Sequence, residues 1–313
     1  MSTDDSTIRE VPEAGTVLVV GYDGSQTSQE ALAWAVAEAR LRGGSVRVIY
    51  AVPPFAETVS PFGGSIGPDF AAAEQAGEQV LAGAVGQAQH LAPGVVVDTR
   101  VVHASAADAL LGSSDRDSLV VVGSRGHGGF AGLLVGSTGV QLANHASCPV
   151  VIIRPSAAGP AAPAGSGAGR IVVGVGGSAA SDQALDFALA EASLRGVGVT
   201  AVEAWKKPPA DLPPAGDDLP SFVVADEMQG TQTRLLSDSL AAASAHFPGV
   251  DLRQEVVHDD PVRALVSCSQ GAVMLVVGSR GHGGVSSLLP GSVSHGVLHH
   301  ARCPVVIVRR PAQ

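Results

Sequence analysis

Short apolar runs alternate with longer amphipathic segments along the chain. The first run, at 16–21, reads TVLVVG and predicts a buried strand. The segment at 28–42 carries apolar residues at the spacing of one helix face, and two glycines follow it directly. The start of the chain therefore predicts a strand followed by a helix.

This alternation continues through the first half of the chain. We expect further strands at 45–52, 95–102, 119–123 and 149–154, an alanine-rich helix that ends near residue 91, and helices at 106–111 and 137–145. Strands that are continuous apolar runs are typical of a parallel sheet covered by helices on both faces. Ligands of such sheets bind beyond the carboxyl ends of the strands, where the strand order changes direction.

The second half of the chain repeats the first. The sequence VVGSRGHGG occurs at 121–129 and again at 276–284, and CPVVI occurs at 148–152 and again at 303–307. A period of about 150 residues is far too long for a solenoid unit, so a whole domain is duplicated. The predicted fold class is α/β, with two tandem open five-stranded parallel sheets, each Rossmann-like with helices on both faces.

The domain boundaries follow from composition. We expect an N-terminal tail at 1–15, a first domain at 16–154, a linker at 155–169 and a second domain at 170–310. The linker reads PSAAGPAAPAGSGAG, a run of small residues that we expect to be mobile because it cannot pack a core.

Composition narrows the class of partner and the compartment. The net charge of −10 argues against a nucleic-acid partner, because such binders carry a basic face. Three cysteines in 313 residues make no disulfide framework, and the polar, acidic start is no signal or transit peptide. The uncharged stretch at 126–153 is interrupted by polar residues and a proline, so it does not predict a membrane span. We expect a cytoplasmic protein with no membrane partner.

A spaced glycine motif is the strongest candidate for chemistry. It reads Gly123-x2-Gly126-x9-Gly136-Ser137 and recurs as Gly278-x2-Gly281-x9-Gly291-Ser292. Each copy begins where an apolar strand ends and closes at a predicted helix start, where unpaired N–H groups and the helix dipole favour an anion. Glycine lets the backbone approach a ligand closely. The motif predicts a phosphate cradle, and a glycine-rich turn that only connects a strand to a helix is the alternative.

Other polar residues near this motif leave its chemistry open. The P-loop pattern is missing, and Arg125 and Arg280 either pair with phosphate or are solvated loop residues. His127 and His282 are read as exposed loop histidines, and the adjacent His299 and His300 as surface residues. We assign no catalytic residue and no metal ligand. We therefore expect a phosphate compound bound in this cradle to be hydrolysed slowly or not at all.

Three pieces of the sequence together resemble the universal stress protein family, of the ATP-binding type. They are VVGYDGS at 19–25, the spaced glycine motif, and HASCPV at 145–150 with its counterpart HARCPV at 300–305. The resemblance implies ATP with Mg²⁺ lying across the strand ends, with Asp23 beside the adenosine and Ala51 in the adenine pocket. The implied first site comprises Gly21, Tyr22, Asp23, Ala51, Val122, Gly123, Arg125, Gly126, Gly136, Ser137 and Thr138.

The second domain departs from this pattern because Gly176 stands where the first has Asp23. Losing one such contact costs about 1–3 kcal/mol, so we expect a weaker second site. The residues implied there are Gly174, Val175, Gly176, Ala204, Val277, Gly278, Arg280, Gly281, Gly291, Ser292 and Val293.

The resulting hypothesis is an ATP-binding stress-response regulator that acts by nucleotide occupancy on an unknown protein partner. A slow Mg²⁺-dependent ATPase and an interaction scaffold that binds no nucleotide are the two alternatives. Members of the family often dimerise through the last strands, and the duplicated domains could satisfy that contact internally. Whether two chains then form a homodimer is left open.

Overall fold

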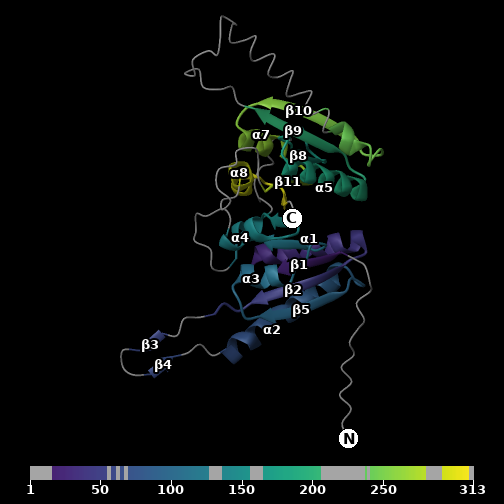
Figure 1. Cartoon of the computed structure of the whole chain (residues 1–313). Helices are drawn as coiled ribbons and strands as arrows, with labels where there is room; N and C mark the ends of the chain where they lie inside the picture. The colour runs from purple at the N-terminus through teal and green to yellow at the C-terminus, as the bar shows by residue number, and fades with distance from the viewer. Residues whose placement is uncertain are drawn as a thin grey trace, which may run out of the picture.

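The fold is that of a computed structural model (Figure 1), which describes residues 16–54, 58–60, 64–66, 70–126, 136–155, 165–205, 237, 240–279 and 291–309. The α/β class is confirmed, because strands and helices alternate throughout both halves. Among the described helices, none combines the length and the apolar character that crossing a membrane requires.

The first domain contains every element that the hydrophobic pattern predicts. In chain order these are β1 Val17–Gly21, α1 Gln26–Arg42, β2 Ser45–Ala51, α2 Phe70–Leu91, β5 Val97–Val102, α3 Ala106–Gly112, β6 Leu119–Gly123, α4 Ser137–His145 and β7 Val150–Ile153. The loop after β2 holds a small antiparallel pair that the pattern did not predict, β3 Thr58–Ser60 with β4 Gly64–Ile66.

The second domain repeats this order. Its described elements are β8 Ile171–Gly174, α5 Ala179–Arg195, β9 Val199–Trp205, β10 Leu252–His258, α7 Pro261–Cys268, β11 Met274–Gly278, α8 Ser292–His300 and β12 Val305–Val308.

Helix α1 shows how local sequence sets the boundaries. Ser25 is the N-cap and its side chain accepts a hydrogen bond from the amide of Ser28, so the helix begins two residues before the predicted start. Gly43 ends the helix in the left-handed conformation, at φ 64°, which costs glycine little. Helix α5 is bounded in the same way by Ser178 and Gly196.

The ten large strands form a single sheet. Their order is β10-β9-β8-β11-β12-β7-β6-β1-β2-β5, and every neighbouring pair is parallel except β12 with β7. The expectation of two separate five-stranded sheets is therefore corrected: each domain supplies five parallel strands, and the two sets join through antiparallel last strands. The strand order within each domain changes direction beside β1 and beside β8, which is where a doubly wound sheet binds ligands.

The join between the domains is as buried as the core itself. Val305, Val306 and Ile307 pair with Ile152, Val151 and Val150, and all six are at most 2% exposed. Two apolar layers, one on each face of the sheet, contain residues from both domains. Apolar strand edges would be unstable if exposed, so this pairing removes two edges at once.

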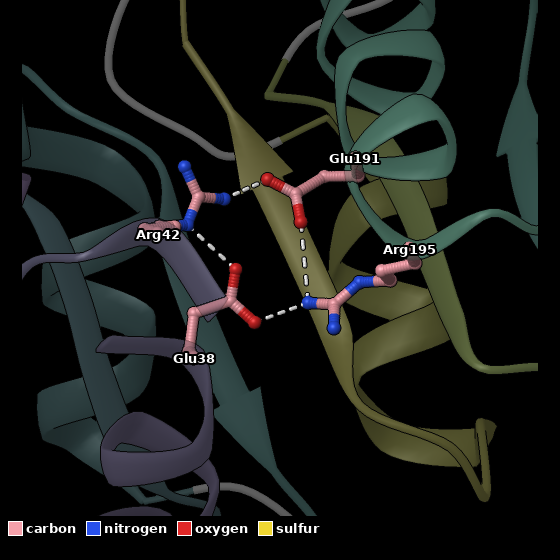
Figure 2. Close-up of polar contacts among 4 residues, drawn as sticks. All are labelled: Glu38, Arg42, Glu191 and Arg195. Carbon is pink, nitrogen blue, oxygen red and sulfur yellow. Dashed lines mark hydrogen bonds and ion pairs between the residues drawn. The ribbon is translucent and has the colours of Figure 1, made fainter. Parts of the chain in front are cut away.

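A ring of four charged residues joins α1 to α5 on one face of the sheet (Figure 2). Arg42 bonds Glu38 on its own helix, with Nε 2.6 Å from Oε1, and reaches Glu191 on the other. Arg195 repeats this arrangement, bonding Glu191 on its own helix at 3.2 Å and Glu38 across the interface. Both glutamate side chains are at most 3% exposed, so each depends on the two arginines for its charge to be tolerated.

The end of the expected linker belongs structurally to the second domain. The amides of Gly165, Gly167 and Gly169 donate to the carbonyls of Gln270, Cys268 and Gly271. These residues therefore pack beside α7, contrary to the expectation that all of 155–169 is mobile. The preceding residues, 156–164, lie outside the described part of the chain.

Candidate functional site

A cleft opens at the carboxyl ends of β1, β2 and β6, at the change of strand order in the first domain. It encloses about 720 Å³, part of it open to solvent. Its described lining comprises Gly21, Tyr22, Asp23, Ser28, Ile49, Tyr50, Ala51, Ala106, Leu110, Val122, Gly123, Arg125, Gly126, Gly136, Thr138 and Gly139. The structure thus brings together all the residues expected for the first site except Ser137, which is exposed at the start of α4.

Asp23 lies at the centre of the polar end of this cleft. Its Oδ1 accepts a hydrogen bond from the amide of Ser25 at 3.0 Å, so the carboxylate stabilises the turn between β1 and α1. A Cβ atom built on Gly126 would lie 2.5 Å from Oδ2 of Asp23. The backbone of the glycine motif therefore passes directly over the carboxylate, and only glycine fits this approach without movement.

Thr27, which the sequence pattern did not single out, fixes the loop after β6. Its hydroxyl donates to the carbonyl oxygen of Arg125. A Cβ atom on Gly123 would lie 2.7 Å from Oγ1 of the same threonine. The first turn of α1 and the loop of the glycine motif are thus packed together, and this places Arg125 at the rim of the cleft, where its side chain is exposed.

The start of α4 faces the same end of the cleft. Its N-cap is Gly136, whose amide donates to the carbonyl of Ser124 at 2.8 Å, and no side chain caps the helix. The amides of the first turn are therefore not satisfied by a capping side chain, and Thr138 and Gly139 of that turn line the cleft. An uncapped helix start with its positive dipole end can bind an anion.

The opposite end of the cleft is apolar. Ile49, Ala51, Leu110 and Val122 line it together with Tyr50. Gly21 belongs to this wall, because a Cβ there would lie 3.0 Å from Leu110 and 3.1 Å from Val122. Such a wall suits a flat, apolar ring, while the charged groups lie at the other end.

Tyr22 connects the cleft to α2. Its hydroxyl donates to Oε1 of Gln87 at 3.4 Å, and Gln87 in turn donates to the carbonyl of Gln29. Burial, and secondarily the negative charge of Asp23, raises the pKa of the Tyr22 phenol. Tyr22 therefore remains neutral at physiological pH and acts through packing and hydrogen bonding.

Four of the lining residues that the sequence pattern missed are brought to the cleft by the fold. Ile49 pairs with Gly21 in the parallel register, so the end of β2 has to adjoin the end of β1. Tyr50 precedes the expected Ala51 on the same strand. Ala106 and Leu110 are one turn apart on α3, which follows β5 as α4 follows β6. Strand order, which single-sequence patterns do not give, decides that these residues meet.

The second domain preserves the tight packing at the strand ends. A Cβ on Gly174 would lie 3.2 Å from Leu265, and one on Gly278 would lie 2.7 Å from the backbone of Ala180, which occupies the place of Thr27. Gly291 again begins a helix without a side-chain cap, and its amide donates to Ser279. Of the other residues expected there, Val175 and Val277 are buried, Ala204 and Val293 half-buried and Ser292 exposed, whereas Arg280 and Gly281 lie outside the described residues.

Side chains at the corresponding strand end differ between the domains. Among the described residues, none lies within 4 Å of a Cβ built on Gly176, so none of them requires glycine where the first domain has Asp23. Gly281, the counterpart of Gly126, lies outside these residues. Glu203 replaces Tyr50, and burial raises the pKa of its carboxyl. Trp205 replaces Val52 and stacks on His258, with ring centroids 4.4 Å apart. The two strand ends therefore present different chemistry.

Known proteins resemble this chain over most of its length. A model of the universal stress protein family matches residues 16–154 and 167–309. A universal stress protein of Mycobacterium tuberculosis is 35% identical over 296 residues, covering 93% of this chain and 96% of that protein. One from Mycolicibacterium smegmatis is 32% identical over 299 residues, again covering 93% and 96%.

A solved structure extends the comparison to the fold. The crystal structure of a universal stress protein from Archaeoglobus fulgidus superposes with a TM-score of 0.63, covering 94% of this chain and 96% of that one. At 18% sequence identity, this likeness concerns the fold alone.

Proposed function

The chain belongs to the universal stress protein family, and from the geometry of its first cleft we propose that it binds ATP there and acts as a regulator through nucleotide occupancy. The observation that carries the proposal is the close approach of the Gly126 backbone to the Asp23 carboxylate. This approach brings a bare backbone, a carboxylate and the uncapped start of α4 to one end of an otherwise apolar cleft.

The two ends of the cleft match the two ends of a nucleoside triphosphate. The apolar wall of Ile49, Ala51, Leu110 and Val122 would hold the base, and the Asp23 carboxylate would accept hydrogen bonds from the sugar. The phosphates would lie against the amides at the start of α4 and beside Arg125. Mg²⁺ would neutralise part of the phosphate charge, and we assign no protein ligand to it.

The charged side chains in the described lining of the cleft favour nucleotide occupancy over nucleotide hydrolysis. Asp23 and Arg125 are the only charged side chains in its described lining. Asp23 is bonded to the turn that it stabilises and lies beneath Gly126, which leaves it poorly placed to activate water. Fast phosphoryl transfer needs concentrated positive charge at the transferred group, and one exposed arginine supplies little of it.

A regulator of this kind would be stabilised by the nucleotide that it binds, and occupancy would change a surface that a partner recognises. Nucleotide at about 100 times its Kd adds about 2.7 kcal/mol to the free energy of unfolding. The partner protein that reads this state, and a location in the cytoplasm, are parts of the same proposal.

The test is urea unfolding of nucleotide-stripped protein with and without Mg-ATP, combined with measurement of phosphate release. We expect stabilisation of the wild type, little stabilisation of Asp23→Ala, and phosphate release too slow to alter the ATP concentration during the experiment. Rapid release that Asp23→Ala abolishes would instead support the ATPase. An unchanged unfolding curve in the wild type would support the scaffold that binds no nucleotide.

A further inference from the structure

Two histidines face one another on α8. His295 and His299 are one helical turn apart, and their Nε2 atoms are 3.4 Å apart. The ring centroids are 4.6 Å apart and the planes are inclined by 54°. His295 is exposed and His299 is half-buried.

The spacing of the two nitrogens matches a metal chelate. Zinc binds imidazole nitrogen at about 2.0–2.1 Å in a tetrahedral arrangement, which puts two such nitrogens about 3.3 Å apart. Ligands at right angles with the same bond lengths would be about 2.9 Å apart, as in square-planar or octahedral sites. Histidines at positions i and i+4 of a helix are also the pair that helical zinc sites use. We propose that His295 and His299 form a zinc site on the second domain.

A metal site is one of two explanations for the short distance between the two Nε2 atoms. The competing explanation is a hydrogen bond between two neutral rings, and this explanation predicts no uptake of zinc.

Among the described residues, the proposed site has two protein ligands. Arg154, at the end of β7, donates to the carbonyls of Leu298 at 2.5 Å and His299 at 3.3 Å, which fixes the last turn of α8. Within the described ranges, no cluster of three histidine, cysteine or acidic residues could hold a metal. Water would complete the coordination, so the site is open and its zinc exchangeable.

The first domain provides an internal control. At the same offset of 155 residues, α4 carries Val140 and Asn144 in place of His295 and His299. His145 corresponds to His300, so a histidine at the end of the helix is common to both domains and the facing pair is not. The proposed zinc site is therefore specific to the second domain.

The test is equilibrium dialysis of the full, untagged chain against Zn²⁺ at pH 7.5 without nucleotide, with the bound metal quantified. We expect one zinc per chain in the wild type and none in His295→Val or His299→Asn, which install the first-domain residues. His300→Asn should retain the zinc. The double substitution Val140→His with Asn144→His should build a second site and raise the uptake to two.

Two further measurements separate this site from other sources of zinc uptake. Uptake should fall as the pH is lowered, because protons compete with zinc for the imidazole nitrogens. Asp23→Ala should retain the zinc, so a failure of the nucleotide proposal leaves this one intact. No uptake by the wild type, or equal uptake by His295→Val and the wild type, would overturn the zinc site.

Discussion

The contact between Gly126 and Asp23 joins two segments that are about 100 residues apart in sequence. The spaced glycines and the acid after the first strand are both visible in the sequence, but their contact is a property of the fold. A Cβ atom added to Gly126 would lie only 2.5 Å from Oδ2 of Asp23, so any other residue there would have to displace the carboxylate, although the backbone of Gly126 is not left-handed. A Cβ on Gly176 would meet none of the described residues within 4 Å.

Substituting Gly126 with alanine should therefore displace the Asp23 carboxylate and weaken ATP binding. A loss of one to two decades in affinity is expected, corresponding to about 1–3 kcal/mol for a disrupted polar contact. Calorimetric titration measures this directly. Gly176→Ala is the matched control and should leave the affinity of the first cleft unchanged; equal losses in the two variants would contradict the assignment.

The three cysteines should be chemically inert in the native protein. All three are free and buried, and burial raises the pKa of Cys303 to about 11. At pH 8 only about 0.1% of such a thiol is thiolate, the reactive form. A thiol reagent at pH 8 should label none of them before unfolding and all three in denaturant. Ala82→Cys, on the exposed side of α2, should react at once and so verify the assay; rapid native labelling of Cys303 would show that its environment opens.

At the scale of elements, the start of α4 is left without the capping side chain that stabilises α1 and α5. Ser25 and Ser178 cap those helices, whereas Gly136 and Gly291 cannot cap α4 and α8. A helix start that keeps its amides available is less stable and better able to bind an anion. Both copies of the glycine motif end at such a start, which links the motif to its proposed role.

A capping side chain at the start of α4 should therefore stabilise the protein and prevent ATP binding. Gly136→Asp places a carboxylate where a phosphate would bind; its Cβ has room, because the nearest atom is 3.7 Å away. We expect the free energy of unfolding to rise by a few tenths of a kcal/mol, as for glycine against aspartate at an N-cap, and ATP binding to be lost. Gly291→Asp should stabilise α8 similarly without affecting the first cleft. Retained affinity in Gly136→Asp would place the phosphates elsewhere.

The elements themselves were largely predictable, because each follows from local pattern. Helix α1 begins two residues early through Ser25, and the pair β3–β4 was missed because no hydrophobic alternation marks it. The residues of the candidate site that belong to a sequence motif were predicted. Those that only the fold brings to the site were missed. Thr27 and Tyr50 are ordinary helix and strand residues in the sequence. Because β1 lies between β2 and β6, Thr27 reaches the loop after β6 and Tyr50 lines the cleft.

At the scale of the whole molecule, the two domains share one sheet and the apolar layers on its two faces. The duplication is visible in the sequence, but the pairing of β7 with β12 depends on which strands lie at the edges. One signal of the interface was present and overlooked: Glu38-x3-Arg42 recurs as Glu191-x3-Arg195 at an offset of 153 residues. Because each helix carries both charges, a pseudo-twofold arrangement lets each arginine reach the opposite glutamate (Figure 2).

Breaking this ring should destabilise the protein far more than breaking an exposed ion pair. Removal of one partner from a buried pair costs about 3–5 kcal/mol, because it leaves buried charge uncompensated. Without Glu38, Arg42 and Arg195 would both depend on Glu191 alone. We expect Glu38→Ala to approach this range in urea unfolding. Asp98→Ala, which removes the exposed partner of Arg47 and Arg100, should cost less than about 1 kcal/mol. Similar values for the two variants would mean that the ring contributes nothing to domain pairing.

The most direct test of the proposed function is calorimetric titration of Mg-ATP into nucleotide-stripped wild type and Asp23→Ala, with the number of sites per chain as the result. We predict one strong site in the wild type, in the first cleft, with any second site markedly weaker. In Asp23→Ala the strong site should be lost. Two equal sites, or a strong site that survives Asp23→Ala, would contradict the assignment of function to the first cleft.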